Sequence, residues 1–356
     1  MSMDALTEKD LEKMKNHKYS TTGYSWLDNK MNPFWTFCAN LLPYKYSPNM
    51  VTLTGFFCQS ISVVLISFYD LTLTKELPSF MYIIFAILMF LAQTFDAIDG
   101  KHARNTKRSS SLGQLMDHGC DAMSNYILVI VISQAHCFGP TLYTLLLQFG
   151  IQSTFYLFTL EEHFSGVLRT KMDNLGVTEY QFFGMAILAI PAFVGQFFQE
   201  KTIFGFSIAK ILLILAFLSA IKLCIHLIII DSKDIKDAWE KWNHMLIYLV
   251  LSVGQFLTIK MQLFEKIPLV IVLLNGLYFG FLASKLIIDN MSERKFKFFD
   301  LDVLIFVIGI IIAVILNNVF VEIIIIGLLF IWVIIAYYIN IIGAVKQLLN
   351  YLNISF

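Results

Sequence analysis

The sequence carries little charge for its length. Of its 356 residues, 15% are Asp, Glu, Lys or Arg, whereas 57% are hydrophobic, and the mean hydropathy is +0.69. A soluble core cannot bury that much apolar surface, which excludes an ordinary soluble domain and makes lipid the solvent for most of the chain. The formal net charge is zero, so nothing draws the whole chain to nucleic acid, and no nucleic-acid partner is expected.

Paired cysteine motifs are also missing, and no cleavable signal peptide is expected. The five cysteines form no CxxC pair and lack the spacing of metal ligands, which argues against a disulfide framework and a zinc site. They are Cys38, Cys58, Cys120, Cys137 and Cys224. The first 47 residues lack the short apolar run of a cleavable signal peptide, so insertion is expected to depend on the first membrane helix.

What the sequence has instead is a series of apolar runs, each long enough to cross a hydrocarbon layer of roughly 30 Å. They predict an all-α integral membrane protein with about ten transmembrane helices in one domain at 48–345. An N-terminal segment at 1–47 precedes this domain, and a short tail at 346–356 follows it. The runs lie at about 51–69, 78–97, 118–138, 140–160, 179–198, 208–230, 245–263, 267–289, 299–317 and 319–345.

Basic residues favour one side of the predicted bundle. Four alternate loops carry twelve Lys and Arg residues, whereas the opposite loops carry three. Because cytoplasmic loops are enriched in these residues, the first set of loops and both chain termini are predicted to be cytoplasmic. Apolar and aromatic residues between 26 and 46 predict an amphipathic helix that lies in the interface and anchors the chain to membrane lipid.

Four aspartates stand at the facing ends of the second and third predicted helices, which a basic loop joins. Asp96 and Asp99 are three residues apart. Asp117 and Asp121 are four residues apart. Residues at these spacings share one face of a helix, so two facing pairs would form a cup of four carboxylates.

Such a cup predicts metal ions and a phosphorylated substrate. Four like charges at the edge of a low-dielectric layer repel each other and lose solvation, so they persist as carboxylates only where cations neutralise them. Hard oxygen ligands select Mg²⁺ or Mn²⁺, and two ions fit one cup. Ions of this kind bridge phosphate oxygens during an in-line displacement, which predicts a substrate that contains a diphosphate.

Three small residues and an arginine accompany the aspartates. Gly100, Ala103 and Gly113 let helices, or a nucleotide, approach the backbone closely. Arg104, one turn from Gly100, can form two hydrogen bonds to one phosphate group. All four are candidate substrate-binding residues.

From Asp96 to Asp121 the sequence follows the pattern D-x2-D-G-x2-A-R-x8-G-x3-D-x3-D, with every fixed position filled. This pattern is the signature of the CDP-alcohol phosphotransferase family, class I, which the chain resembles over about 18–345. The resemblance implies that three aspartates hold two divalent metals, and that a fourth either completes the metal shell or acts as general base. These are Asp96, Asp99 and Asp117, with Asp121 as the fourth. It also implies that four residues contact or make room for CDP: Gly100, Ala103, Arg104 and Gly113.

His118 is a second candidate for the general base. Its unperturbed pKa near 6.5 suits proton acceptance at neutral pH, so the choice between Asp121 and His118 stays open. The Asp-His-Gly-Cys-Asp form at 117–121 resembles the eukaryotic choline and ethanolamine phosphotransferase branch.

Membership of that branch implies a reaction and a setting. Phosphoethanolamine or phosphocholine would pass from CDP-ethanolamine or CDP-choline to diacylglycerol, which gives phosphatidylethanolamine or phosphatidylcholine and CMP. A homodimer in the endoplasmic reticulum or Golgi membrane is implied as well.

Two polar residues outside the motif resemble further positions of the branch. Asn49, in Pro48-Asn49-Met50-Val51-Thr52, either binds the nucleotide or belongs to an ordinary helix start, while Thr52 caps or packs. Glu179, at the start of the fifth predicted helix, either faces substrate or is an acid favoured by the helix dipole. Glu161, Glu162 and His163 lack the HExxH spacing and are expected as solvated loop charges.

Two other functions compete. A family sibling would use CDP-diacylglycerol as a lipid donor, although the 117–121 form and the ten predicted helices argue against it, because those relatives typically have about six. A polytopic cation transporter would use the acidic cup to move ions. The release of CMP distinguishes an enzyme from the transporter.

Overall fold

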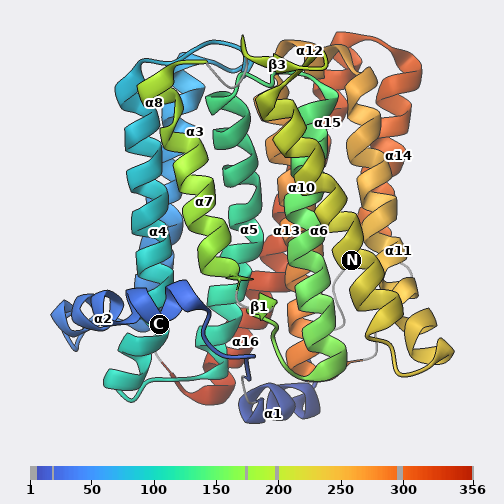
Figure 1. Ribbon diagram of the computed structural model, residues 1–356. Helices are drawn as coiled ribbons and strands as arrows, with labels where there is room; N and C mark the ends of the chain where they lie inside the picture. The colour runs from blue at the N-terminus through green and yellow to red at the C-terminus, as the bar shows by residue number, and fades with distance from the viewer. Residues whose placement is uncertain (1–5, 18–19, 173–174, 197–199, 295–299, 355–356) are drawn as a thin grey trace.

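The structure, a computed structural model, describes residues 6–17, 20–172, 175–196, 200–294 and 300–354. Long helices run side by side, and α1 and α2 lie across one end of the bundle (Figure 1). In the described residues the strands form two short antiparallel pairs, in which Lys171 faces Gly176 and Thr202 faces Ser207. They are β1 (Lys171–Met172), β2 (Leu175–Gly176), β3 (Thr202–Ile203) and β4 (Phe206–Ser207). The predicted all-α class is confirmed.

Each of the ten predicted spans contains a helix. The bundle comprises α3 (Pro48–Tyr69), α4 (Ser79–Asn105), α5 (Ser111–Ala135), α6 (Leu142–Ser165), α7 (Val177–Ala189), α8 (Pro191–Val194), α10 (Ile208–Ile225), α11 (Ile235–Leu257), α13 (Pro268–Ser292), α14 (Leu301–Leu316) and α15 (Val319–Tyr337). Short elements extend or join them: η1 (His226–Ile230), η2 (Thr258–Lys260), α12 (Gln262–Lys266), η3 (Tyr338–Ile342) and α16 (Gly343–Leu352).

Seven helices in the described part of the chain are long and apolar enough to cross a bilayer. They are α3, α4, α7 with α8, α10 with η1, α11 with η2, α13, and α15 with α16. α14 is apolar but has 16 residues, and α5 and α6 have 25 and 24 residues yet carry many polar side chains. An integral membrane protein is therefore confirmed, while the number of crossings stays a prediction.

The predicted interfacial stretch is helical as α2 (Trp26–Leu41). Ser25 and Asp28 form a capping box at its start, in which each side chain accepts the other residue's backbone N–H. Trp35 packs in a small apolar cluster with Val51 and Ile98 of the neighbouring helices. Aromatic residues such as Trp26 stay exposed on the outer side, which fits contact with lipid head groups.

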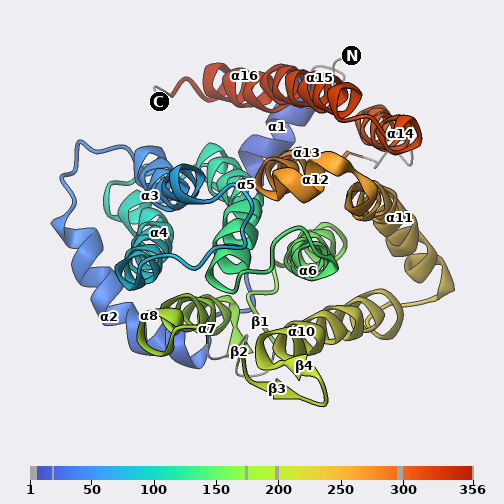
Figure 2. The ribbon, with the colours of Figure 1, turned by 90° about the horizontal axis from the view of Figure 1, so that it is seen from above.

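The helix α1 (Glu8–Asn16) was not expected from the sequence. It lies beneath the bundle near α5, α13 and α16 (Figure 2). Its apolar residues Leu11 and Met14 are buried. Asp10 forms an ion pair with Arg294 at 2.7 Å, and Lys13 forms one with Glu293 at 3.0 Å. These contacts hold α1 against the end of α13.

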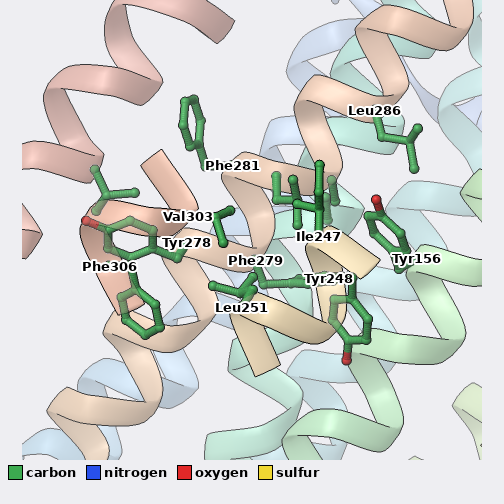
Figure 3. Packing of buried hydrophobic residues seen from close by; sticks show 14 of the residues in the cluster. Tyr156, Ile247, Tyr248, Leu251, Tyr278, Phe279, Phe281, Leu286, Val303 and Phe306 are labelled. Atoms are coloured by element: carbon green, nitrogen blue, oxygen red, sulfur yellow. The ribbon is translucent and has the colours of Figure 1, made fainter. Parts of the chain in front are cut away.

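The largest apolar core surrounds α13, which lies between α5, α6, α11 and α15 (Figure 2). Aromatic rings fill it (Figure 3). Tyr156 of α6 stacks on Tyr248 of α11 with ring centroids 5.1 Å apart, and Tyr278 of α13 lies 4.5 Å from Phe306 of α14. Such pairs add to the stabilisation that burial alone provides.

The ends of α4 and α5 differ from the prediction. Apolar runs ended at 97 and resumed at 118, but α4 continues to Asn105 and α5 begins at Ser111, where the Ser110 side chain accepts the N–H of Gly113. Helical hydrogen bonds do not require apolar side chains, so these helices continue past the apolar runs. The motif consequently lies almost entirely on two helices, and its basic residues Lys101 and Arg104 are helical.

Candidate active site

Three of the four motif aspartates converge between α4 and α5. One carboxylate oxygen from each of Asp96, Asp117 and Asp121 lies within 4.8 Å of the other two, and all three side chains are partly buried. Asp117 and Asp121 share a face of α5 because they are four residues apart, and Asp96 meets them from α4. This carboxylate cluster stands on the half of the bundle that carries α1 and α2.

The cluster fits a hard divalent cation. Asp117 Oδ1 is buried and has no hydrogen-bond partner among the described residues. A buried carboxylate oxygen without a partner is costly, and three gathered acids repel each other when ionised. The ligand atoms are all oxygens, as Mg²⁺ and Mn²⁺ prefer. The residues present therefore suit the metal that the sequence pattern implies.

Asp99 is oriented differently from the other three. It is 7% exposed, and its Oδ2 accepts a hydrogen bond from the hydroxyl of Thr52 on α3. It does not belong to the group of three oxygens within 4.8 Å. Its role as a metal ligand stays a prediction.

Asn49 and Gly113 are brought together across α3 and α5. A Cβ atom added at Gly113 would lie 3.8 Å from both Asn49 Oδ1 and Ser110 Oγ. Asn49 is 7% exposed, and its amide makes no hydrogen bond to the described residues. An amide without a partner among the described residues, beside a residue that has no side chain, leaves hydrogen-bonding capacity for a ligand.

Gly100, Ala103 and Arg104 follow Asp99 on the last turns of α4. A Cβ at Gly100 would lie 3.5 Å from Nη1 of Arg104, so the guanidinium folds back over the glycine. Arg104 is exposed and forms no ion pair with the described residues. An unpaired guanidinium beside a carboxylate cluster is suited to phosphate.

His118 is buried on α5 and lies outside the carboxylate cluster. It interacts electrostatically with His17, the residue that follows α1. The choice between Asp121, a member of the cluster, and His118 as the general base therefore stays open.

Glu179 lies apart from the cluster, at the first turn of α7. Its Oε2 accepts the backbone N–H of Gly176 and its Oε1 accepts that of Leu27, each at 2.8 Å. The carboxylate thereby caps α7 and joins it to the start of α2. Contact with substrate remains a prediction for this residue.

The expected solvated loop at 161–163 is wrong. Glu161 and Glu162 lie within α6 at 8% and 3% exposure, and His163 lines a cavity of about 1240 Å³ at this end of the bundle. α1 and the ends of α6, α11 and α13 form its walls. Inside it, burial lowers the pKa of His17, and the charge of Glu293 opposes that effect.

Sequence reasoning missed two polar contacts of the motif. Besides the bond from Thr52 to Asp99, the buried His102 ring places Nε2 2.8 Å from the backbone oxygen of Tyr46. His102 occupies a variable position of the pattern, and Thr52 lies 47 residues from Asp99, so spacing along the chain carries no signal for either.

Known proteins place the chain in a family. A sequence model described as CDP-alcohol phosphatidyltransferase matches residues 45–221, which include the whole motif. Cholinephosphotransferase 1 of Homo sapiens is 28% identical over 306 residues, covering 82% of this chain and 75% of its own. Uncharacterized CDP-alcohol phosphatidyltransferase class-I family protein 2 of Dictyostelium discoideum is 29% identical over 315 residues, covering 83% and 72%. Cholinephosphotransferase 1 of Saccharomyces cerevisiae is 33% identical over 206 residues, covering 58% and 51%. The chain is thus a membrane transferase that belongs to the CDP-alcohol phosphatidyltransferase family.

Proposed function

We propose that the protein transfers phosphocholine or phosphoethanolamine from CDP-choline or CDP-ethanolamine to diacylglycerol and releases CMP. The observation that carries this proposal is the carboxylate cluster of Asp96, Asp117 and Asp121, built where two helices of a membrane bundle meet. Metal ions held by such a cluster would bind a diphosphate, and the membrane setting gives the site access to a lipid alcohol. The names of the human and yeast relatives support this donor class.

Two divalent ions, Mg²⁺ or Mn²⁺, would be held by Asp96, Asp117 and Asp121 together with Asp99. When bound, such ions neutralise the diphosphate and absorb the charge that develops on it. The protein's own contribution is to hold the acids at fixed positions on α4 and α5.

The residues beside the cluster would bind the CDP portion of the donor. The guanidinium of Arg104 would donate hydrogen bonds to a phosphate. The unpartnered amide of Asn49 faces the space above Gly113, where a nucleotide can approach the backbone. Gly100 and Ala103 keep the adjoining turns of α4 free of bulky side chains.

The chemical step is a substitution at the β-phosphorus of the donor. The hydroxyl oxygen of diacylglycerol attacks this phosphorus, the bond from phosphorus to the CMP oxygen breaks, and CMP leaves. The hydroxyl proton passes to Asp121 or to His118. Holding acceptor and donor in line within one site supplies much of the rate.

The setting of the reaction belongs to the same proposal. The unit at 48–345 would be the transmembrane transferase domain, with the 1–47 segment and the 346–356 tail on the cytoplasmic side. A homodimer in the endoplasmic reticulum or Golgi membrane follows from the family resemblance. The excess of Lys and Arg in alternate loops supports the orientation.

The test uses purified full-length protein in detergent with Mg²⁺, diacylglycerol and one radiolabelled CDP-alcohol at a time. We expect CMP and a labelled lipid from CDP-choline or CDP-ethanolamine, and the better donor assigns the head group. Product only from CDP-diacylglycerol with a soluble alcohol would favour the sibling function. Cation flux into proteoliposomes without CMP release would favour a transporter.

A further inference from the structure

We infer that Thr52 is a positioning residue, which fixes the orientation of Asp99 and so sets how tightly the site holds its metal ions. The inference rests on the proposed function for the metal-holding role of Asp99. It concerns a residue on α3, a helix outside the aspartate motif, and gives its hydroxyl a role beyond helix capping or packing.

The hydroxyl of Thr52 has one proton and two acceptors in reach. Asp99 Oδ2 is the nearer, and the carbonyl of Pro48, one turn back on α3, lies at 3.3 Å. A carboxylate is the stronger acceptor, and charge-assisted bonds are shorter than neutral ones, so the proton points to Asp99. Thr52 and Asp99 are 8% and 7% exposed, so little water competes for this bond.

The fit of α3 against α4 brings the two side chains within reach. A Cβ added at Gly55, one turn after Thr52, would come within 3.0 Å of Phe95 Cβ and 3.1 Å of the carbonyl oxygen of Ala92. Only a glycine permits that approach without displacement. The seam at Gly55 therefore sets the distance between α3 and the turn of α4 that carries Asp96 and Asp99.

Because of this bond, the two aspartates of α4 point to different partners. Asp96 turns to Asp117 and Asp121, while Asp99 is turned to Thr52 on α3. Without the hydroxyl, Asp99 Oδ2 would lose its side-chain donor, and nothing on α3 would hold the carboxylate in this orientation. Hydrogen-bond donors to metal-binding carboxylates typically change metal affinity by 10- to 100-fold.

The experiment measures Mn²⁺ binding to purified full-length variants in detergent, from the electron paramagnetic resonance signal of free Mn²⁺. We expect Thr52→Val, which keeps the shape and removes the hydroxyl, to raise the dissociation constant by about 10- to 100-fold. Thr52→Ser should restore it to near the wild-type value. Thr54→Val is the matched control, because the Thr54 hydroxyl bonds the carbonyl of Met50 at 2.7 Å and does not contact the motif.

A double-mutant cycle separates the loss of the hydroxyl from a general loss of folding, because a folding defect of Thr52→Val would lower Mn²⁺ affinity in both the wild-type and the Asp99→Asn backgrounds. With Asp99→Asn in place, adding Thr52→Val should change Mn²⁺ affinity no further, because the hydroxyl acts only through Asp99. Additive losses would overturn the inference, and so would wild-type affinity in Thr52→Val or equal losses in the Val and Ser variants. Since Mn²⁺ binding needs no CDP-alcohol, a wild-type protein that releases no CMP would refute the proposed function and leave this result intact.

Discussion

α13 and α15 are both apolar helices, yet they occupy opposite environments. In the most apolar stretch of α13, 83% of the residues are buried, against 28% for α15 with α16. The mean hydropathy of these stretches is 1.9 and 3.0, so the more apolar helix is the less buried. Where lipid is the solvent, an apolar side chain gains little by moving from lipid into protein, and hydropathy does not identify the core.

Small residues make the difference between the two helices. A Cβ at Gly276 of α13 would lie 2.1 Å from Tyr126 Cβ, and one at Gly280 would lie 2.4 Å from Met123 Sδ, both on α5. A Cβ added at Gly327 of α15 would meet no atom of the neighbouring helices within 4 Å in the described part of the chain. α13 is therefore central because its glycines allow α5 to approach closely. This contact between α13 and α5 begins two residues beyond Asp121. The core helix thus supports the helix that carries half of the site.

The largest effect is expected from a substitution in the carboxylate cluster itself. Asp117→Asn removes the central charge of the carboxylate cluster, and turnover of the CDP-alcohol should fall on the order of 10³-fold or more. CMP release from radiolabelled donor measures it. Glu265→Gln, an exposed acid of α12 at the other end of the bundle, should leave turnover unchanged. Wild-type turnover in Asp117→Asn would exclude the cluster from the chemistry.

Substitution of Lys285 tests how much its ion pairs, which connect α13 to its lipid-facing neighbours, stabilise the fold. Its Nζ lies 2.8 Å from Asp300 Oδ2 and 2.6 Å from Asp302 Oδ2, and Trp332 of α15 donates to Asp302 Oδ1 at 3.0 Å. Lys285→Met leaves two largely buried carboxylates without their cation, which should cost about 3 kcal/mol of unfolding free energy. The thermal unfolding midpoint in detergent measures the loss.

Lys346→Met supplies the comparison for that variant. Lys346 is exposed, and its Nζ bonds the hydroxyl of Tyr338 at 2.9 Å. Surface interactions of this kind contribute little to stability, so the midpoint should hardly move. Equal shifts in the two lysine variants would mean that the network around Lys285 does not join the helices.

Substitution of one glycine in each helix tests whether α13 and α15 pack differently. Gly276→Ala forces a methyl group against Tyr126, and overpacking of this kind costs about 1–3 kcal/mol. Gly327→Ala meets open space, and alanine favours a helix over glycine by about 0.5–1 kcal/mol, so the same change should be neutral or stabilising there. Thermal unfolding of both variants decides the matter. Shifts of the same sign would show that the two helices pack alike.

The parts of the site that follow from local spacing were predictable. Asp117 and Asp121 share a face because four residues make about one helical turn. Because a loop joins α4 directly to α5, the two helices were expected to be neighbours. The orientation of Asp99 was not predictable, because it depends on Thr52 of another helix, 47 residues away. The spacing along the chain thus predicted that motif aspartates come together, whereas the separate orientation of Asp99 depends on how α3 packs against α4.

The fold shows the same division. Apolar runs located the bundle helices, since each must be long enough to cross lipid. They misplaced the ends of α4 and α5, because an apolar run marks the edge of a membrane and not the end of a helix. They did not indicate α1, whose nine residues are mostly polar and whose partner Arg294 lies 284 residues from Asp10.

The smallest effect is expected at α1 and depends on pH. Burial alone would raise the pKa of Asp10, but hydrogen bonds from Arg294 and from Thr7 outweigh it and lower the pKa to about 2. Because the folded value lies below the unfolded value near 3.9, the carboxylate contributes its full stabilisation above about pH 4 and loses it as the pH falls toward 2. Opening of α1 should therefore increase severalfold across that interval.

Hydrogen exchange of residues 8–16, corrected for the intrinsic pH dependence of exchange, measures this opening. Asp10→Asn should open more readily than wild type already at pH 7 and show no further change between pH 4 and 2, because the titrating group is gone. The expected difference is on the order of 1 kcal/mol, since both side chains retain some exposure to solvent. Wild-type protection in Asp10→Asn at neutral pH would mean that the buried Leu11 and Met14 hold α1 in place without the ion pair.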